Sequence, residues 1–156
     1  MRIHLFRIIV YIALALMVWS CILPKEDKST VLVFTPKKVN LDYQMQYISV
    51  SVNCKRSLDV VQFAVIADGK HYYESYDKTE VNTYRNPKEV DSSVPRYIKG
   101  PWFTVEIPAS PVETLTVEIE ENNKVIQRSL TLGGMFHVGE CTITQEAHPI
   151  GQNGDI

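Results

Sequence analysis

The sequence predicts an all-β fold, a sandwich of seven or eight short strands, and three observations support this prediction. From residue 31 onward, apolar and polar residues alternate with a period of two, most regularly over 48–54, 103–107 and 115–120. Turn-forming residues separate these runs, and no stretch has the apolar stripe of an amphipathic helix. Because such strands bury one face and leave the other in water, they pack as two sheets around a common core.

Eight runs are expected as strands, with turn signals between them. Asp68-Gly69, Gly100-Pro101 and Gly133-Gly134 are among the clearest of these signals, because glycine, proline and aspartate favour the backbone angles of tight turns. The expected strands cover residues 31–35, 39–43, 48–54, 60–67, 103–107, 115–120, 125–132 and 140–145.

Length and charge restrict the classes of protein to which this chain can belong. Its 156 residues provide for one domain, and 45% of them are hydrophobic, which is typical of a chain that folds. With 16 Lys and Arg against 18 Asp and Glu, the formal net charge is −2. Nucleic-acid binding normally needs a basic surplus, so we expect no nucleic-acid partner. A multi-domain enzyme and a multi-span membrane protein are not expected either.

The N-terminus has the composition of a secretory signal peptide, which we expect to cover residues 1–20. Two arginines precede an apolar run over 8–19, and the small residue Ser20 precedes Cys21. The run is shorter than the roughly 20 apolar residues that cross a bilayer as a helix. A membrane anchor that stays uncleaved is the alternative.

Two short motifs around Cys21 resemble signals of bacterial lipoproteins. Val-Trp-Ser-Cys at 18–21 resembles the lipobox, and Lys-Glu-Asp at 25–27 resembles the export signal of Bacteroidetes lipoproteins. The resemblance implies that the Cys21 thiol is acylated and that the protein is lipid-anchored in the outer membrane, at the cell surface. Each buried methylene contributes about 0.8 kcal/mol, so two or three chains such as palmitate hold a protein firmly on a membrane. A charged tether over 21–30 is the plainer interpretation of the second motif.

Several segments resemble BACON domains, the Bacteroidetes-associated carbohydrate-binding, often N-terminal family. Residues 33–41 and 47–52 resemble its two opening strands, and Pro-Trp-Phe-Thr-Val at 101–105 resembles its tryptophan-led strand. Residues 115–132 resemble its asparagine turn and arginine-led strand, and 141–147 resemble its final strand with the Thr-Gln pattern.

The resemblance implies an immunoglobulin-like β-sandwich on an extracytoplasmic protein of an organism that degrades glycans. We expect this domain to cover residues 31–148, with 149–156 as a flexible C-terminal tail. Between Cys54 and Gly100 the chain is longer than the family pattern. This segment is expected to be either an elaborated hairpin or a long loop on the sandwich.

Tyrosines form the main candidate for a binding surface, because five of the eight fall within residues 72–97. A tyrosine ring offers an apolar face to sugar C–H groups and a hydroxyl for hydrogen bonds. Alternation sends the adjacent rings of Tyr72 and Tyr73 to opposite faces, so at most one of them joins a flat surface. Alternatively, the rings pair across strands and shield a sheet edge. The candidate ligand-contacting residues are Tyr72, Tyr73, Tyr76, Tyr84 and Trp102.

Trp102 has two interpretations, a ring that stacks on a sugar or an anchor of the core or sheet edge. Alternation places Phe103, Val105 and Ile107 inward, which leaves Trp102 on the other face. That placement favours an exposed ring. Its position in the tryptophan-led strand favours an anchor.

Two cysteines, Cys54 and Cys141, remain as an even pair if Cys21 is acylated. By alternation both point into the sandwich. They are expected either to form a disulfide, which an oxidising compartment allows, or to remain two buried thiols that act as small hydrophobic side chains.

No pattern in the sequence indicates catalysis, a metal site or a cofactor, and we expect no enzyme. His71, His137 and His148 lack the spacing of metal ligands, and no serine-hydrolase motif or glycine-rich phosphate loop is present in the sequence. The expected function is that of an accessory module that contacts a glycan or an outer-membrane protein partner. A purely structural spacer or subunit of an envelope complex is one alternative, and an inhibitor of, or adaptor for, a secreted enzyme is another.

Overall fold

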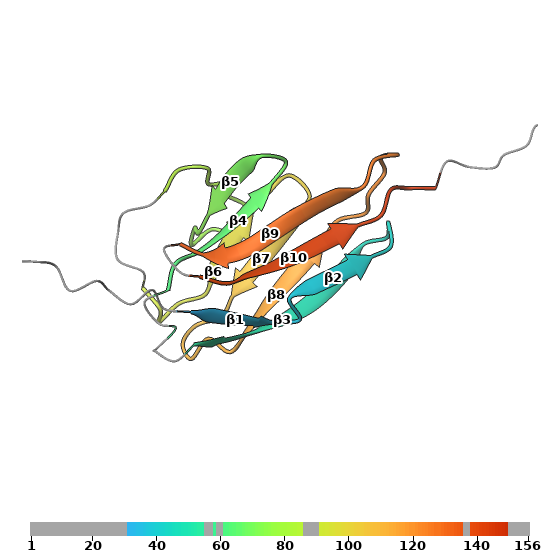
Figure 1. The fold of residues 1–156 in the computed structure, drawn as a ribbon. Helices are drawn as coiled ribbons and strands as arrows, with labels where there is room; N and C mark the ends of the chain where they lie inside the picture. The colour runs from blue at the N-terminus through green and yellow to red at the C-terminus, as the bar shows by residue number, and fades with distance from the viewer. Residues whose placement is uncertain (1–30, 55–57, 59–60, 86–90, 136–137, 150–156) are drawn as a thin grey trace, which may run out of the picture.

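The computed structural model describes residues 31–54, 58, 61–85, 91–135 and 138–149 (Figure 1). These residues form ten strands in two sheets, with no α-helix among them. In this part of the chain no helix is long and apolar enough to cross a bilayer. The predicted signal peptide, the lipobox and the charged tether lie outside the described residues.

The strands of each sheet are antiparallel, with one exception. In spatial order, the first sheet contains β1 (Leu32–Thr35), β3 (Gln46–Cys54), β8 (Thr114–Ile119), β7 (Phe103–Ile107) and β6 (Arg96–Lys99). The second contains β2 (Lys38–Leu41), β10 (Glu140–Gln145), β9 (Arg128–Gly134), β4 (Phe63–Ala67) and β5 (Lys70–Tyr73). The exception is β2, which runs parallel to β10.

Apolar side chains on the inward faces of both sheets form the core. In β8 every second residue is buried, and β3 and β4 follow the same alternation. Each such side chain stabilises the fold by about 1.5–3 kcal/mol on burial. The central members are Val50, Val52, Phe63, Val65, Leu115, Val117, Ile119, Leu130, Leu132 and Ile143. The predicted fold class, an immunoglobulin-like β-sandwich, is confirmed.

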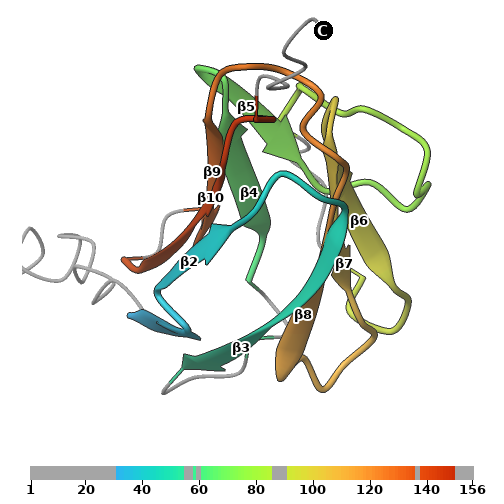
Figure 2. The ribbon, with the colours of Figure 1, turned by 90° about the vertical axis from the view of Figure 1, so that its right-hand side faces the viewer.

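Short bridges join the two sheets at both sides of the sandwich. Figure 2 shows the two sheets facing each other. On one side the Leu32 amide donates to the Val138 carbonyl over 2.7 Å, and Val31 pairs with Val138. On the other side Ser75, just beyond β5, pairs with Tyr97 of β6 through two hydrogen bonds of 2.8 Å. Parts of the outer strands β1 and β6 therefore have hydrogen-bonded neighbours on both sides, which leaves less exposed edge.

The central segment, for which the sequence left a hairpin and a loop open, contains an elaborated hairpin. Strands β4 and β5 meet at Asp68-Gly69, both with positive φ, as in the two-residue turns that suit a hairpin. Residues 74–85 and 91–95, which we call the excursion, lie between β5 and β6. Neither β5 nor β6 was expected as a separate strand, so the described strands number ten. Both are four residues long, and the buried position that opens β6 holds an arginine, Arg96.

A buried glutamine closes one end of the sandwich. Gln145, the last residue of β10, donates from Nε2 to the carbonyls of Gln44 and Tyr43 over 2.8 and 3.1 Å. Its Oε1 accepts from Nε of Arg128 over 2.9 Å. Because buried amides are costly unless they are bonded, these contacts fix the β2–β3 loop against β9 and β10.

Asn122, in the loop between β8 and β9, holds a second junction at the same end. Its side-chain amide donates to the carbonyls of Ile126 and Glu146 over 3.0 and 2.7 Å. Its Oδ1 accepts from the backbone amide of Lys124. The side chain is fully buried, and it supplies hydrogen-bond partners that the backbone of the loop would otherwise lack.

We expect Asn122→Ala to lower the free energy of unfolding by about 3 kcal/mol, because the fully buried amide loses its hydrogen bonds to the Ile126 and Glu146 carbonyls. Asn123→Ala is the matched control, since that neighbouring side chain is exposed, and it should change stability by less than about 0.5 kcal/mol. Urea unfolding followed by tryptophan fluorescence measures both. Equal stability of the two variants would contradict the role assigned to Asn122.

Candidate functional site

The structure separates the two adjacent tyrosines of β5. Tyr72 points inward, is only 4% exposed and meets the Phe103 ring edge-on with centroids 5.4 Å apart. Tyr73 lies on the outer face of the second sheet and is half-buried. The predicted divergence of the two rings is confirmed, and Tyr72 as a ligand-contacting residue was wrong because its ring belongs to the core.

Tyr76 and Tyr84 are exposed on the excursion that follows β5. The Tyr76 hydroxyl accepts from the backbone amide of Asp91 over 3.1 Å, and the Tyr84 ring is 83% exposed. Neither ring joins Tyr73 in lining a pocket on the sheet face. The structure therefore does not gather the candidate tyrosines into a single flat surface.

Trp102 is an anchor of the core and not an exposed stacking ring. It is 6% exposed, its indole N–H donates to the Asp68 carboxylate over 2.9 Å, and it meets the Phe103 ring edge-on. The guanidinium of Arg128 lies over the indole ring of Trp102, 4.4 Å from the ring centroid. Alternation misplaced this residue because it precedes the first residue of β7, where the strand period does not yet apply.

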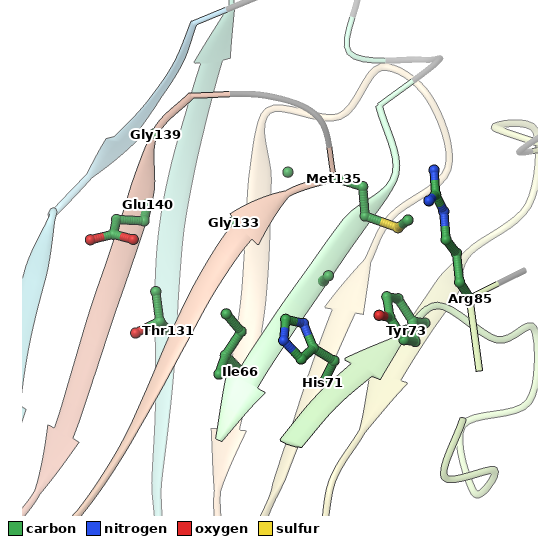
Figure 3. A pocket seen from close by; sticks show the side chains of 11 residues that line it. Ile66, His71, Tyr73, Arg85, Thr131, Gly133, Met135, Gly139 and Glu140 are labelled. Carbon is green, nitrogen blue, oxygen red and sulfur yellow. The ribbon is translucent and has the colours of Figure 1, made fainter. Parts of the chain in front are cut away.

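A pocket of about 350 Å³ lies on the outer face of the second sheet, and we call it the outer-face pocket (Figure 3). Cross-strand register builds it from one row of four residues. Tyr73 pairs with Ala64, Ala64 with Gly133, and Gly133 with Glu140. Neighbouring strands lie about 4.8 Å apart, so the two large end members stand about 14 Å apart at the backbone. The small residues between them leave the hollow.

Aromatic rings form one wall of the outer-face pocket. His71 and Tyr73 are two residues apart on β5 and so share its outer face. Their rings are nearly parallel, with an interplanar angle of 16° and centroids 6.2 Å apart. Figure 3 shows both rings on one side of the pocket and Glu140 on the other. Arg85, from the excursion, lies next to Tyr73.

A glycine fixes the opposite wall. Gly139 has a φ of +129°, and a Cβ atom there would lie 2.0 Å from the carbonyl oxygen of Leu32. Only glycine allows β1 to approach so closely at the start of β10. Glu140 follows directly, so this close approach sets where its carboxylate stands.

The outer-face pocket combines an apolar ring surface, the carboxylate acceptor of Glu140 and the cationic donor Arg85. Thr131 adds a hydroxyl group to the floor, beside the exposed Ile66. Within the described residues, no three His, Cys, Asp or Glu side chains gather as a metal site would require. Such a surface is suited to a ligand that has both C–H faces and hydroxyl groups.

Sequence reasoning found Tyr73 but not the residues that complete the pocket. His71, Arg85 and Glu140 come from three separate parts of the chain. The pairing of Ala64 with Gly133 at the floor is the only signal that could have located them, and it depends on strand register.

Cys54 and Cys141 are not joined by a disulfide. Cys54 ends β3 in the first sheet and is half-buried, whereas Cys141 lies in β10 of the second sheet and is fully buried. Burial raises the pKa of the Cys141 thiol, because the thiolate loses solvation. The structure therefore agrees with the second expectation, in which both cysteines remain thiols, with Cys141 buried and Cys54 half-buried. Cys21, the candidate lipid attachment site, lies outside the described residues.

Comparisons with known proteins give an alignment to a solved structure. No family model matches the chain, and no curated protein matches it. Among solved structures, an NMR structure of a protein from Bacteroides thetaiotaomicron aligns with a TM-score of 0.47 and 17% identity. The alignment covers 83% of this chain and 99% of the other.

Folded protein should alkylate very slowly at Cys141. We expect iodoacetamide to label this thiol at least about 100-fold more slowly than it does in urea, because labelling requires local opening of the core. Mass spectrometry of tryptic peptides measures the rate, with Cys54 as the internal comparison. Equal rates at Cys141 with and without urea would contradict its burial.

Proposed function

We propose that this protein is a non-catalytic lipoprotein of the bacterial cell surface that contacts an uncharged glycan through the outer-face pocket. The observation that carries the proposal is the parallel pair of His71 and Tyr73 rings beside a floor of small residues. Pyranose rings present flat C–H faces, and aromatic side chains offer the matching apolar surface. The proposed role is accessory, within a glycan-utilisation or envelope assembly.

Polar groups around the rings support a glycan over a purely apolar ligand. Glu140 can accept hydrogen bonds from sugar hydroxyls, and Thr131 can both donate and accept. Charges of both signs are present, with Arg85 on the Tyr73 side and Glu140 opposite. A charged glycan would meet a like charge on one side of this lining, so the lining favours an uncharged one.

We also propose that the domain is BACON-like. Residues that carry the resemblance are joined in the structure by the contacts of the closed end: Trp102 under Arg128, Arg128 on Gln145, and Asn122 beside them. A shared structural role gives these types a reason to recur in that pattern. In this proposal they are framework, and the outer-face pocket is a separate feature.

A structural role in the envelope is the second candidate, and one surface favours it. Val31, Val33 and Val138 are exposed where the chain enters the sandwich, and Val31 pairs with Val138. Apolar side chains at this place could rest on a membrane or on a neighbouring subunit. Val33→Glu should then release the protein from its assembly without changing glycan binding.

Tyr73→Ala should lower the affinity for a bound polysaccharide about tenfold, or about 1.4 kcal/mol, because it removes one ring of the wall. Affinity electrophoresis in gels that contain xylan, glucomannan or mixed-linkage β-glucan measures the change. Tyr47→Ala is the control, since that ring is exposed on the outer face of the first sheet. Unchanged mobility of the Tyr73 variant in a gel that retards the parent would exclude the pocket.

Lipid attachment is tested separately. Cells that express the full chain and grow with labelled palmitate should incorporate label into the parent, while the Cys21→Ser variant should stay unlabelled, because the acyl chains of the proposal depend on that thiol. Cys54→Ser, which leaves Cys21 in place, should keep the label. Label in the Cys21→Ser protein would rule out this residue as the attachment site.

A further inference from the structure

Within the excursion, residues 74–85 leave β5 beside the outer-face pocket, and residues 91–95 lead into β6. The excursion carries Arg85, which lines the pocket, together with the exposed Tyr84. Edge pairing of Ser75 with Tyr97 fixes only its first residues. The placement of Arg85 therefore depends on contacts further along the excursion.

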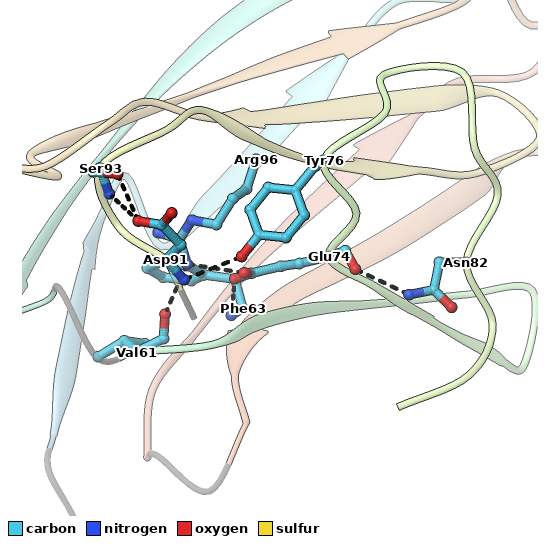
Figure 4. Close-up of polar contacts among 8 residues, drawn as sticks. All are labelled: Val61, Phe63, Glu74, Tyr76, Asn82, Asp91, Ser93 and Arg96. Carbon is cyan, nitrogen blue, oxygen red and sulfur yellow. Dashed lines mark hydrogen bonds and ion pairs between the residues drawn. The ribbon is translucent and has the colours of Figure 1, made fainter. Parts of the chain in front are cut away.

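A buried ion pair lies at the base of the excursion (Figure 4). The Arg96 guanidinium is 1% exposed and donates from Nη1 to Glu74 over 2.8 Å and to the Val61 carbonyl over 3.4 Å. Among the described residues, its Nε and Nη2 have no partner. Glu74 forms the ion pair with this buried cation, and Asp91 adds a weaker electrostatic interaction. Loss of Glu74 would leave the guanidinium without its ion-pair partner.

Glu74 links three segments through its two carboxylate oxygens and its backbone. One oxygen contacts Arg96 at the start of β6, and the other accepts from the Phe63 amide at the start of β4 over 2.5 Å. Burial raises the pKa of Glu74, whereas Arg96 and the Phe63 amide act to lower it. The geometry holds the first residue of the excursion at one fixed point.

Asn82 carries that fixed point forward to the pocket. Its side-chain amide donates to the Glu74 carbonyl over 2.9 Å, and its backbone carbonyl accepts from the Tyr73 amide over 2.8 Å. Its Oδ1 accepts from the Tyr84 amide over 3.0 Å. Asn82 therefore ties the returning chain to the outer edge of β5, three residues before Arg85.

We infer that Asn82 and the Glu74–Arg96 ion pair are positioning residues that hold Arg85 at the rim of the outer-face pocket. Only the expected effect on glycan affinity rests on the proposed function. The geometric part concerns the protein alone. Loss of these contacts would leave the rings of the pocket in place and weaken the backbone support of Arg85 at the rim.

The first experiment measures the excursion without any ligand. Asn82→Ala should raise the rate of tryptic cleavage after Arg85 about tenfold, because its bonds to Glu74 and Tyr84 are lost and local opening becomes easier. Val81→Ala is the matched control, since this neighbouring side chain is exposed. Cleavage at the parent rate in the Asn82 variant would overturn the inference.

The second experiment is a double-mutant cycle on polysaccharide retention, with the same three probe polysaccharides. Asn82→Ala and Arg85→Ala should each weaken retention, and the double variant should be no weaker than Arg85→Ala alone. Additive losses would overturn the assignment of Asn82 as acting through Arg85. If no probe retards the parent, the proposed function fails for these glycans, and the cleavage rates alone decide the inference.

Glu74 gives an independent variant. Glu74→Gln should also speed cleavage after Arg85, because the neutral side chain no longer holds Arg96, and Glu74→Asp should restore part of the protection. If Glu74→Gln does not fold, the result for Asn82→Ala stands by itself, since that side chain is outside the core. Protection in a folded Glu74→Gln protein equal to that of the parent would remove the ion pair from the inference.

Discussion

The period of two in a β-strand is the constraint on which this structure depends. It sends one set of side chains into the core and the alternate set to the surface, so a single strand supplies both core packing and an outer surface. In β5 this happens within two residues, because Tyr72 packs on Phe103 while Tyr73 forms a wall of the outer-face pocket. Substitution on the outer faces can therefore change the surface chemistry without disturbing the packing between the sheets.

Polar contacts do what the apolar core cannot, which is to fix the ends and the excursions of the chain. Gln145 and Asn122 satisfy loop carbonyls at one end, and Arg96 with Glu74 fixes the longest excursion at its base. Each is buried, so its hydrogen bonds are specific in direction where apolar burial is not. The buried ion pair and the pocket are then two parts of one arrangement, connected through the backbone of the excursion.

Eight of the ten described strands overlap runs that the sequence predicted as strands, whereas β5 and β6 were missed. β3, β7, β8 and β10 follow the apolar–polar pattern closely, and the structure places them as strands. β6 was missed because a buried arginine occupies its first position and is tolerated only with Glu74 beside it. The interpretation of Trp102 as an exposed ring came from extending the two-residue period of β7 one residue too far. Of the pocket residues, only Tyr73 was predicted to contact a ligand.

The sequence by itself determined the fold class, the inward set of most strands and the opposite directions of Tyr72 and Tyr73, because these depend on local spacing along one strand. Only the tertiary structure decided which surface residues meet. Tyr73, Ala64, Gly133 and Glu140 form a row because four strands pair in one register, and a shift of a single residue would have turned each partner to the other face. Register is a relation between distant segments, and local spacing does not contain it.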